Sequence, residues 1–207
     1  MKALSSLLLT LSVAVLASCG GSDSSITPPA SGTVTVLLTD GPMDEARSLV
    51  FHVTHVDMGH ADGSMTHLVL PGGPLDIDMM QLQNGAVQSI LNNTTMPAGH
   101  YEWMELGVDL TQSHIGTMSG GQHNMTMSTA HPFRSTEPFE IVPAQHAEFV
   151  MDFDLRRGVQ QHDMGGMMGV EYQLHDAMRL MNTNNTGGIS GAVDVSLMDF
   201  NQASCNS

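Results

Sequence analysis

Short apolar runs separated by turn residues make up most of the chain after Gly32. Residues 33–39 are β-branched and aliphatic, and the turn formers Asp40-Gly41-Pro42 end the run. In residues 149–155 every second side chain is aliphatic or aromatic, and Asp152 and Asp154 lie between them. This two-residue period predicts a half-buried strand.

Residues 49–56 predict a second kind of strand. Strict alternation puts His55 on the same face as Phe51, and the opposite face is also largely apolar. A segment that is apolar on both faces is typical of a central strand. Asp62-Gly63 follows and predicts a hairpin turn into a strand over residues 65–70.

The spacing of these signals predicts about eight to ten strands, with turns at intervals of roughly a dozen residues. The fold class is therefore all-β, and an antiparallel β-sandwich is expected, with a partly open β-barrel as the alternative. Residues 87–91 are expected to form a short turn or helix. Strands are expected over residues 170–181 and 189–198.

The first 19 residues have the pattern of a signal peptide, with Lys2 before an apolar run of about ten residues, too short to span a bilayer. Leu16-Ala17-Ser18-Cys19 resembles the lipobox of bacterial lipoproteins, so Cys19 is the expected lipidation site. Acyl chains there would make the membrane a partner of the chain. Gly20 after the cysteine resembles the sorting pattern for the outer membrane.

The rest of the chain divides into three expected parts. Residues 20–31 are rich in Ser, Gly and Pro and predict a flexible tether. Residues 32–182 are expected to form the β-sandwich domain. Residues 183–207 are expected to form a C-terminal strand or tail, or the start of a truncated second β-domain. If Cys19 is acylated, Cys205 has no intramolecular partner and is either a free thiol or an intermolecular bridge.

The charge balance excludes one class of partner. Six Lys and Arg residues face 21 Asp and Glu residues, for a formal net charge of -15. Affinity for nucleic acid depends on neutralising phosphates with basic side chains, so nucleic acid is not expected as a partner.

Four stretches in order resemble one family of bacterial and archaeal lipoproteins, described as domain of unknown function 4382. They are residues 32–42 (GTVTVLLTDGP), 82–86 (LQNGA), 96–101 (MPAGHY) and 152–157 (DFDLRR). The resemblance implies a β-sandwich module of the cell envelope. It implies no reaction, ligand or catalytic residue, and the abundance of Met and His in this chain departs from the family pattern.

The chain holds 18 Met and 11 His. His123, Met125 and Met127 stand at alternate positions, so a strand would place them on one face. Polar residues and Gly-rich loops surround them, which leaves the methionines no obvious core to fill. Thioethers with an imidazole are a soft ligand set suited to Cu(I).

A second candidate copper site follows along the chain. Its glycines would let His162, Met164, Met167 and Met168 converge on one ion. The stretch resembles the Met-rich repeats of periplasmic copper-resistance proteins. The opposing interpretation is that Met serves as an adaptable core filler.

Enzyme signatures such as His-Glu-x-x-His or Gly-x-Ser-x-Gly do not occur in the sequence, so no catalytic activity is expected. The sequence favours a non-catalytic envelope protein that binds copper. The alternative is a structural or adhesion module that binds a glycan or an envelope protein without metal, for which Trp103 and Tyr101 are the aromatic candidates.

Overall fold

The computed structural model describes residues 30–41, 43, 46–165, 170–187 and 191. The expected signal peptide, Cys19, most of the expected tether, the last expected strand and Cys205 lie outside these residues. The first strand begins at Ser31, close to the boundary expected between tether and domain. Within the described residues, no helix is long and apolar enough to cross a membrane.

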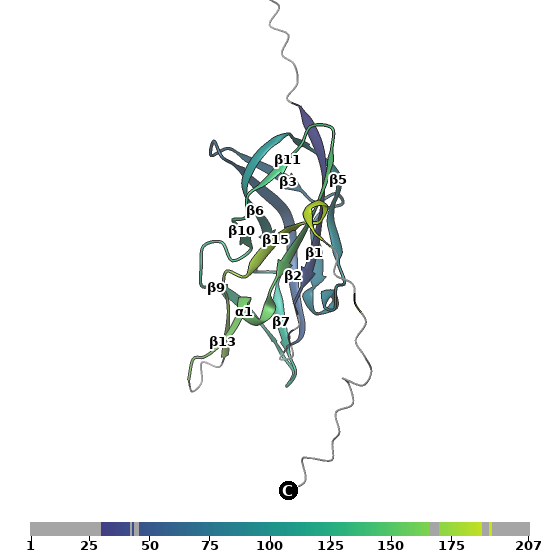
Figure 1. The fold of residues 1–207 in the computed structure, drawn as a ribbon. Coiled ribbons are helices and arrows are strands. Elements are labelled where there is room, and N and C mark those ends of the chain that lie inside the picture. Colours follow the sequence, from purple (N-terminus) through teal and green to yellow (C-terminus); the bar gives the residue numbers. More distant parts are fainter. Residues whose placement is uncertain (1–29, 42, 44–45, 166–169, 188–190, 192–207) are drawn as a thin grey trace, which may run out of the picture.

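Strands dominate the structure (Figure 1), and the one α-helix among the described residues is a single turn. The elements are β1 (Ser31–Asp40), β2 (Ala46–His60), β3 (Met65–Val69), β4 (Leu75–Asp78), η1 (Met79–Leu82), β5 (Gln88–Pro97), β6 (Gly99–Val108), β7 (His114–Thr117), β8 (Gln122–His123), β9 (Met125–Met127), β10 (Arg134–Ser135), β11 (Phe139–Ile141), β12 (His146–Phe153), α1 (Leu155–Gly158), β13 (Val159–Asp163), β14 (Val170–Leu174), β15 (Met178–Asn182) and η3 (Thr183–Asn185).

The strands form two main sheets and a small third one. The smaller main sheet has the order β15-β12-β1-β5. The larger has the order β10-β6-β2-β7-β8, with β3 and β4 also paired to β2 and β11 to β6. The third has the order β13-β14-β9. Among the described strands no sheet closes on itself, so the β-sandwich prediction is confirmed over the barrel alternative.

Most of the strand pairs are antiparallel, but two are parallel. Strand β1 runs parallel to β12, and β14 runs parallel to β9. Two further expectations differ locally from the structure. Residues 88–91 belong to strand β5 instead of a turn or helix, and the segment 170–181 is divided into β14 and β15 by a break at residues 175–177.

Aromatic rings join the two main sheets across the core. The ring of Phe51 on β2 meets that of Phe153 on β12 edge to face, with centroids 5.6 Å apart. Phe133 packs against both, at 5.0 and 5.4 Å. Edge-to-face pairs at these separations are favoured by the ring quadrupoles, beyond the area that they bury. The sandwich is therefore held by direct contact between its two inner faces.

Strand β2 changes face near its middle, between Val53 and Val56. Phe51 and Val53 are fully buried, and so are Val56 and Met58, so the buried positions pass from odd to even numbers. The pairing with β6 shifts register between Val53 and His55, which marks a β-bulge. A bulge adds one unpaired residue and re-aims the side chains that follow it. His55 therefore points away from the core, contrary to the strict alternation expected from the sequence.

The hairpin between β2 and β3 fixes a second register. The predicted turn is present, but the loop has three residues, 61–63, and the backbone amide of His60 donates to the carbonyl oxygen of Ser64 at 2.8 Å. Gly63 closes it with φ +83°, a conformation that glycine adopts at little cost. A two-residue turn would place Met58 opposite His67; the three-residue loop places Asp57 there.

Asp40, at the end of β1, is a buried carboxyl group with an incomplete set of hydrogen bonds. Its Oδ1 accepts the backbone amide of Leu155 at 3.4 Å, while Oδ2 is buried with no partner in the described structure. Burial is the largest cause that raises the pKa of Asp40 to about 8, and the nearby charges of Asp152 and Asp154 raise it further. The folded state therefore favours the protonated acid.

We predict that Asp40 makes the folded protein less stable as the pH rises from about 4 to above 8. Its pKa is higher in the folded state than in the unfolded state, so the folded state binds the extra proton and the free energy of unfolding falls with increasing pH. Asp40→Asn should flatten this slope. Urea unfolding at pH values across that range measures it.

Asp109→Asn is the matched control. Hydrogen bonds from Gln112 and Thr111 lower the pKa of Asp109 to about 2, so its removal changes the slope of stability against pH only below about pH 4 and leaves the slope between pH 4 and above 8 as it is. An unchanged slope in Asp40→Asn would contradict the prediction.

Candidate metal centre on the larger sheet

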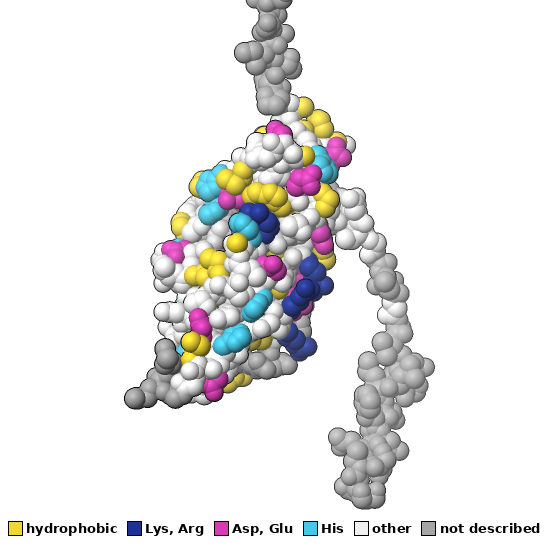
Figure 2. All heavy atoms as spheres, turned by 90° about the vertical axis from the view of Figure 1, so that its left-hand side faces the viewer, with side chains coloured by type: hydrophobic (Ala, Val, Ile, Leu, Met, Phe, Trp, Pro, Cys, Tyr) yellow, Lys and Arg dark blue, Asp and Glu magenta, His cyan; other side chains and the backbone are white. Residues whose placement is uncertain are grey.

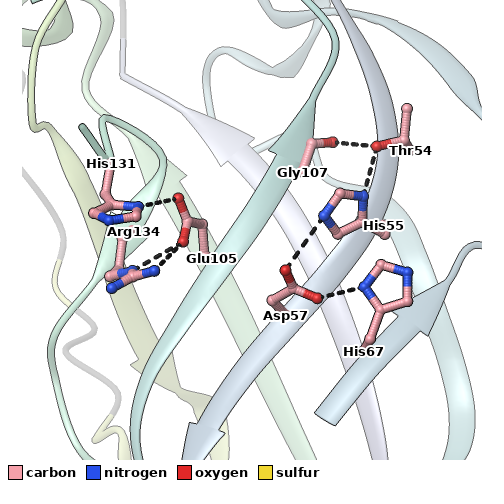
Figure 3. Close-up of polar contacts among 8 residues, drawn as sticks. All are labelled: Thr54, His55, Asp57, His67, Glu105, Gly107, His131 and Arg134. Atoms are coloured by element: carbon pink, nitrogen blue, oxygen red, sulfur yellow. Dashed lines mark hydrogen bonds and ion pairs between the residues drawn. The ribbon is translucent and has the colours of Figure 1, made fainter. Parts of the chain in front are cut away.

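Three metal-ligand residues meet on the outer face of the larger sheet. His55 and Asp57 come from β2, and His67 comes from β3 (Figure 3). Nδ1 of His67 lies 2.7 Å from Oδ1 of Asp57, and Nε2 of His55 lies 3.3 Å from Oδ2 of the same carboxylate. One ligand atom from each residue can be chosen so that all lie within 4.8 Å of one another.

This separation is close to what a metal ion requires. Zinc binds imidazole nitrogen at about 2.0–2.1 Å, so tetrahedral ligand atoms stand about 3.3 Å apart. His67 is about half exposed and Asp57 is 17% exposed, so solvent reaches the cluster from one side.

Thr54 fixes the orientation of one imidazole. Its hydroxyl donates to the carbonyl oxygen of Gly107 at 3.2 Å, and its Oγ1 lies 2.7 Å from Nδ1 of His55. Since the hydroxyl proton is already used, Oγ1 accepts a hydrogen bond from Nδ1–H of His55. Neutral His55 then presents the lone pair of Nε2 to the Asp57 carboxylate. Two acceptors that face each other need a cation between them, either a proton or a metal ion.

Asp57 lies in a row of charged side chains that crosses four strands. The row runs from His67 on β3 through Asp57 on β2 and Glu105 on β6 to Arg134 on β10. Like charges directly opposite each other across a strand pair are destabilising. Each carboxylate is therefore compensated on its far side, Asp57 by the imidazoles and Glu105 by Arg134 and His131 (Figure 3).

Two glycines, Gly107 on β6 and Gly59 on β2, leave space for the rings of His55 and Trp103 on the adjacent strand. A Cβ atom on Gly107 would lie 2.2–2.4 Å from the ring atoms of His55, and one on Gly59 would lie 2.1 Å from the nearest ring atoms of Trp103. Real Cβ atoms do not approach other atoms so closely. The imidazole of His55 therefore lies flat over the β6 backbone, in a position that only glycine at residue 107 allows.

The first sequence-predicted copper cluster differs in exposure from residue to residue. Met125 is 4% exposed and belongs to the hydrophobic core, so the expectation that it has no core to fill is wrong. Met127 is half exposed. His123 lies on β8 with its ring 5.4 Å from that of Tyr172, whose strand pairs with β9.

One residue of the second cluster, His162, lies in the same three-stranded sheet. His162 on β13 is paired with Glu171 on β14, whereas Met125 is paired with the next residue, Tyr172. Successive side chains of a strand point to opposite faces, so His162 and Met125 lie on opposite faces of the sheet. Met164 is 48% exposed, and Met167 and Met168 lie outside the described residues. Ligation of copper by these residues stays a prediction.

The aromatic candidates for an adhesion surface are largely unavailable. Tyr101 is fully buried and stacks on Phe139, with ring centroids 5.1 Å apart. Trp103 is partly exposed, but the guanidinium carbon of Arg134 lies 3.8 Å from the centre of its ring. The structure therefore leaves no free pair of aromatic rings at these two positions.

The geometry defines an all-β sandwich module that carries a His-Asp-His cluster on the outer face of one sheet. A family model described as a domain of unknown function, DUF4382, matches residues 31–169, and the chain belongs to this family. The resemblance to this family is thereby confirmed, whereas lipidation stays a prediction. No curated protein and no solved structure shows a significant match to the chain.

We predict that Gly107→Ala displaces the imidazole of His55, because the new methyl group would occupy its place. The hydrogen bond to Thr54 should be lost, with a decrease of about 1 kcal/mol in the free energy of unfolding. The ¹⁵N chemical shifts of the imidazole measure the change. Gly187→Ala, which meets no atom within 4 Å, should leave those shifts as they are. Equal shifts in both variants would contradict this placement of His55.

Proposed function

We propose that this protein is a non-catalytic, lipid-anchored module of the bacterial cell envelope, placed in the outer membrane, that binds a divalent transition-metal ion through His55, Asp57 and His67. The single observation that carries the metal proposal is the convergence of two imidazoles and one carboxylate within 4.8 Å on adjacent strands. The hydrogen bond from His55 to Thr54 supports it, because outer-shell partners of this kind orient metal-binding imidazoles.

The ligand chemistry favours copper(II) or zinc. Imidazole suits zinc and copper, whereas magnesium and calcium prefer sets made only of oxygen ligands. For one site copper(II) is expected to bind more tightly than zinc, following the general order of divalent affinities. Three protein ligands leave a coordination position open, and half-exposed His67 gives that position access to solvent. Such a site suits capture or buffering of metal.

The softer Met/His loops are a second place where copper could bind, as Cu(I). The supporting observation is that Met127 and Met164 are each about half exposed in or next to the small sheet. Their thioethers suit Cu(I) and compete poorly for zinc. The two candidate sites can therefore be separated by the metal used and by substitution.

We predict that the full chain, purified with a chelator and then dialysed, binds one equivalent of zinc or copper(II) at the His-Asp-His cluster. His67→Gln and Asp57→Asn should each weaken binding by at least about tenfold, which is the usual minimum for loss of even an outer-shell partner. Isothermal titration calorimetry measures both. Acidification should weaken binding, because protons compete for the imidazoles.

Two matched variants test the location. His100→Gln removes an exposed imidazole that has one carboxylate beside it, Glu102 at 3.5 Å, and should leave affinity unchanged. Met127→Leu should leave zinc binding unchanged, because its thioether belongs to the other candidate site. Absence of a zinc or copper(II) equivalent in the wild-type chain, or equal losses in His100→Gln and His67→Gln, would refute the proposed centre.

The envelope anchor is tested separately at the two cysteines. We predict that cells fed a labelled fatty acid attach the label to the wild-type chain and to Cys205→Ser, but not to Cys19→Ser. Only the first two should remain in the membrane fraction, since a stable anchor needs more than one acyl chain. Label retained by Cys19→Ser would contradict lipidation at that residue.

A further inference from the structure

A cavity of about 500 Å³ lies at the edge of the sandwich, where β10 of the larger sheet approaches β15 of the smaller one. Its wall comes from the loop after β9, from β10, from α1 and from β15. The volume is within the range of small-ligand sites. His131 and Arg134 reach it, but none of the three proposed metal ligands lines it.

Arginine is concentrated at this cavity. The whole chain has six Lys and Arg residues against 21 Asp and Glu residues, and Arg134, Arg157 and Arg179 all line the one cavity. Figure 2 shows the dark-blue side chains gathered on the right-hand half of the face in view. The lining also holds Glu137, Asp154 and Asp176, so its formal charge is zero, whereas the whole chain carries -15. An anionic group therefore meets less repulsion at this cavity than over the acidic protein as a whole.

The three guanidinium groups differ in how many of their N–H donors remain available to a ligand. Arg134 is committed to Glu105. Arg179 is 59% exposed and contacts Asp154 at 3.3 Å and Asp152 at 3.7 Å, in both cases through Nη2, so its other nitrogens point elsewhere. Within the part of the chain that the structure describes, the guanidinium of Arg157 has no ion pair. Arg157 and Arg179 are therefore the groups available to a ligand.

Acceptors share the same wall. Asp176 accepts a hydrogen bond from the hydroxyl of Thr129 at 2.6 Å. Glu137 is exposed and also lines the cavity. Together with Asp154 they would repel a polyanion such as a phosphate cluster. They would instead accept hydrogen bonds from hydroxyl groups. The wall thus combines guanidinium groups, which can bind one carboxylate through paired N–H donors, with carboxylates that can accept hydrogen bonds from several hydroxyl groups.

We infer that this cavity binds a uronic acid residue of an acidic glycan. The sugar carboxylate pairs with Arg157 and Arg179, whose planar guanidinium groups match it in a bidentate geometry. The sugar hydroxyls donate to Asp176 and Glu137. This glycan site is separate from the proposed metal centre and does not depend on it.

The test is a calorimetric titration of the metal-free full chain with three trimers, of galacturonate, glucuronate and mannuronate. At least one trimer should bind, and its methyl ester, which has the same shape without the charge, should bind at least about tenfold more weakly. Inorganic phosphate should also bind more weakly than the trimer. Because a chelator is present, failure of this test is distinguishable from failure of the metal proposal.

Arginine variants locate the site. Arg157→Gln and Arg179→Gln should each weaken trimer binding by about tenfold, as expected for lost hydrogen bonds to a charged group. Arg47→Gln removes an arginine that does not line this cavity and should have no effect. Thermal unfolding confirms that each variant is folded. The inference is overturned if no trimer binds, if the methyl ester binds equally well, or if Arg47→Gln loses as much affinity as Arg157→Gln.

Discussion

The two-residue period of strand β2, broken in its middle by the bulge after Val53, is the constraint on which the rest of the structure depends. Before the bulge β2 buries Phe51 and Val53, and after it Val56 and Met58. Both sets of side chains fill the same core. The bulge also turns His55 to the outer face, next to Asp57. Without that single extra residue, the core contacts of one half of β2 or the polar cluster of the other would be lost.

Methionine has two roles in this chain. Eight methionines are buried and pack between the sheets: Met43, Met58, Met79, Met96, Met104, Met125, Met151 and Met178. An unbranched and polarisable side chain fits irregular gaps, which a core with few aromatic residues leaves between its sheets. Much of the methionine content therefore reflects packing. The exposed minority, which includes Met127 and Met164, is what remains for metal chemistry.

Sequence patterns predicted the sandwich and most of the strands, because alternation and turn residues are local signals. They did not predict the His-Asp-His cluster, because that cluster depends on two shifts of one residue. The bulge after Val53 brings His55 outward, and the three-residue loop before Ser64 sets Asp57 opposite His67. The one sequence signal that could have indicated the cluster was the placement of His55, Asp57 and His67 on the two sides of a predicted hairpin. Loop length, which fixes register, could not be read with that accuracy from the sequence.

The parallel pairing of β1 with β12 has a consequence for how the chain reaches its final form. The first strand of the domain lies between β5 and β12, and the second of these partners ends only at Phe153. Contacts between such distant segments carry a large loop-closure cost and slow the search for the native arrangement. A chain that emerges from its amino end therefore leaves one edge of β1 unpaired until about three quarters of its residues have emerged, which favours an open state during transit.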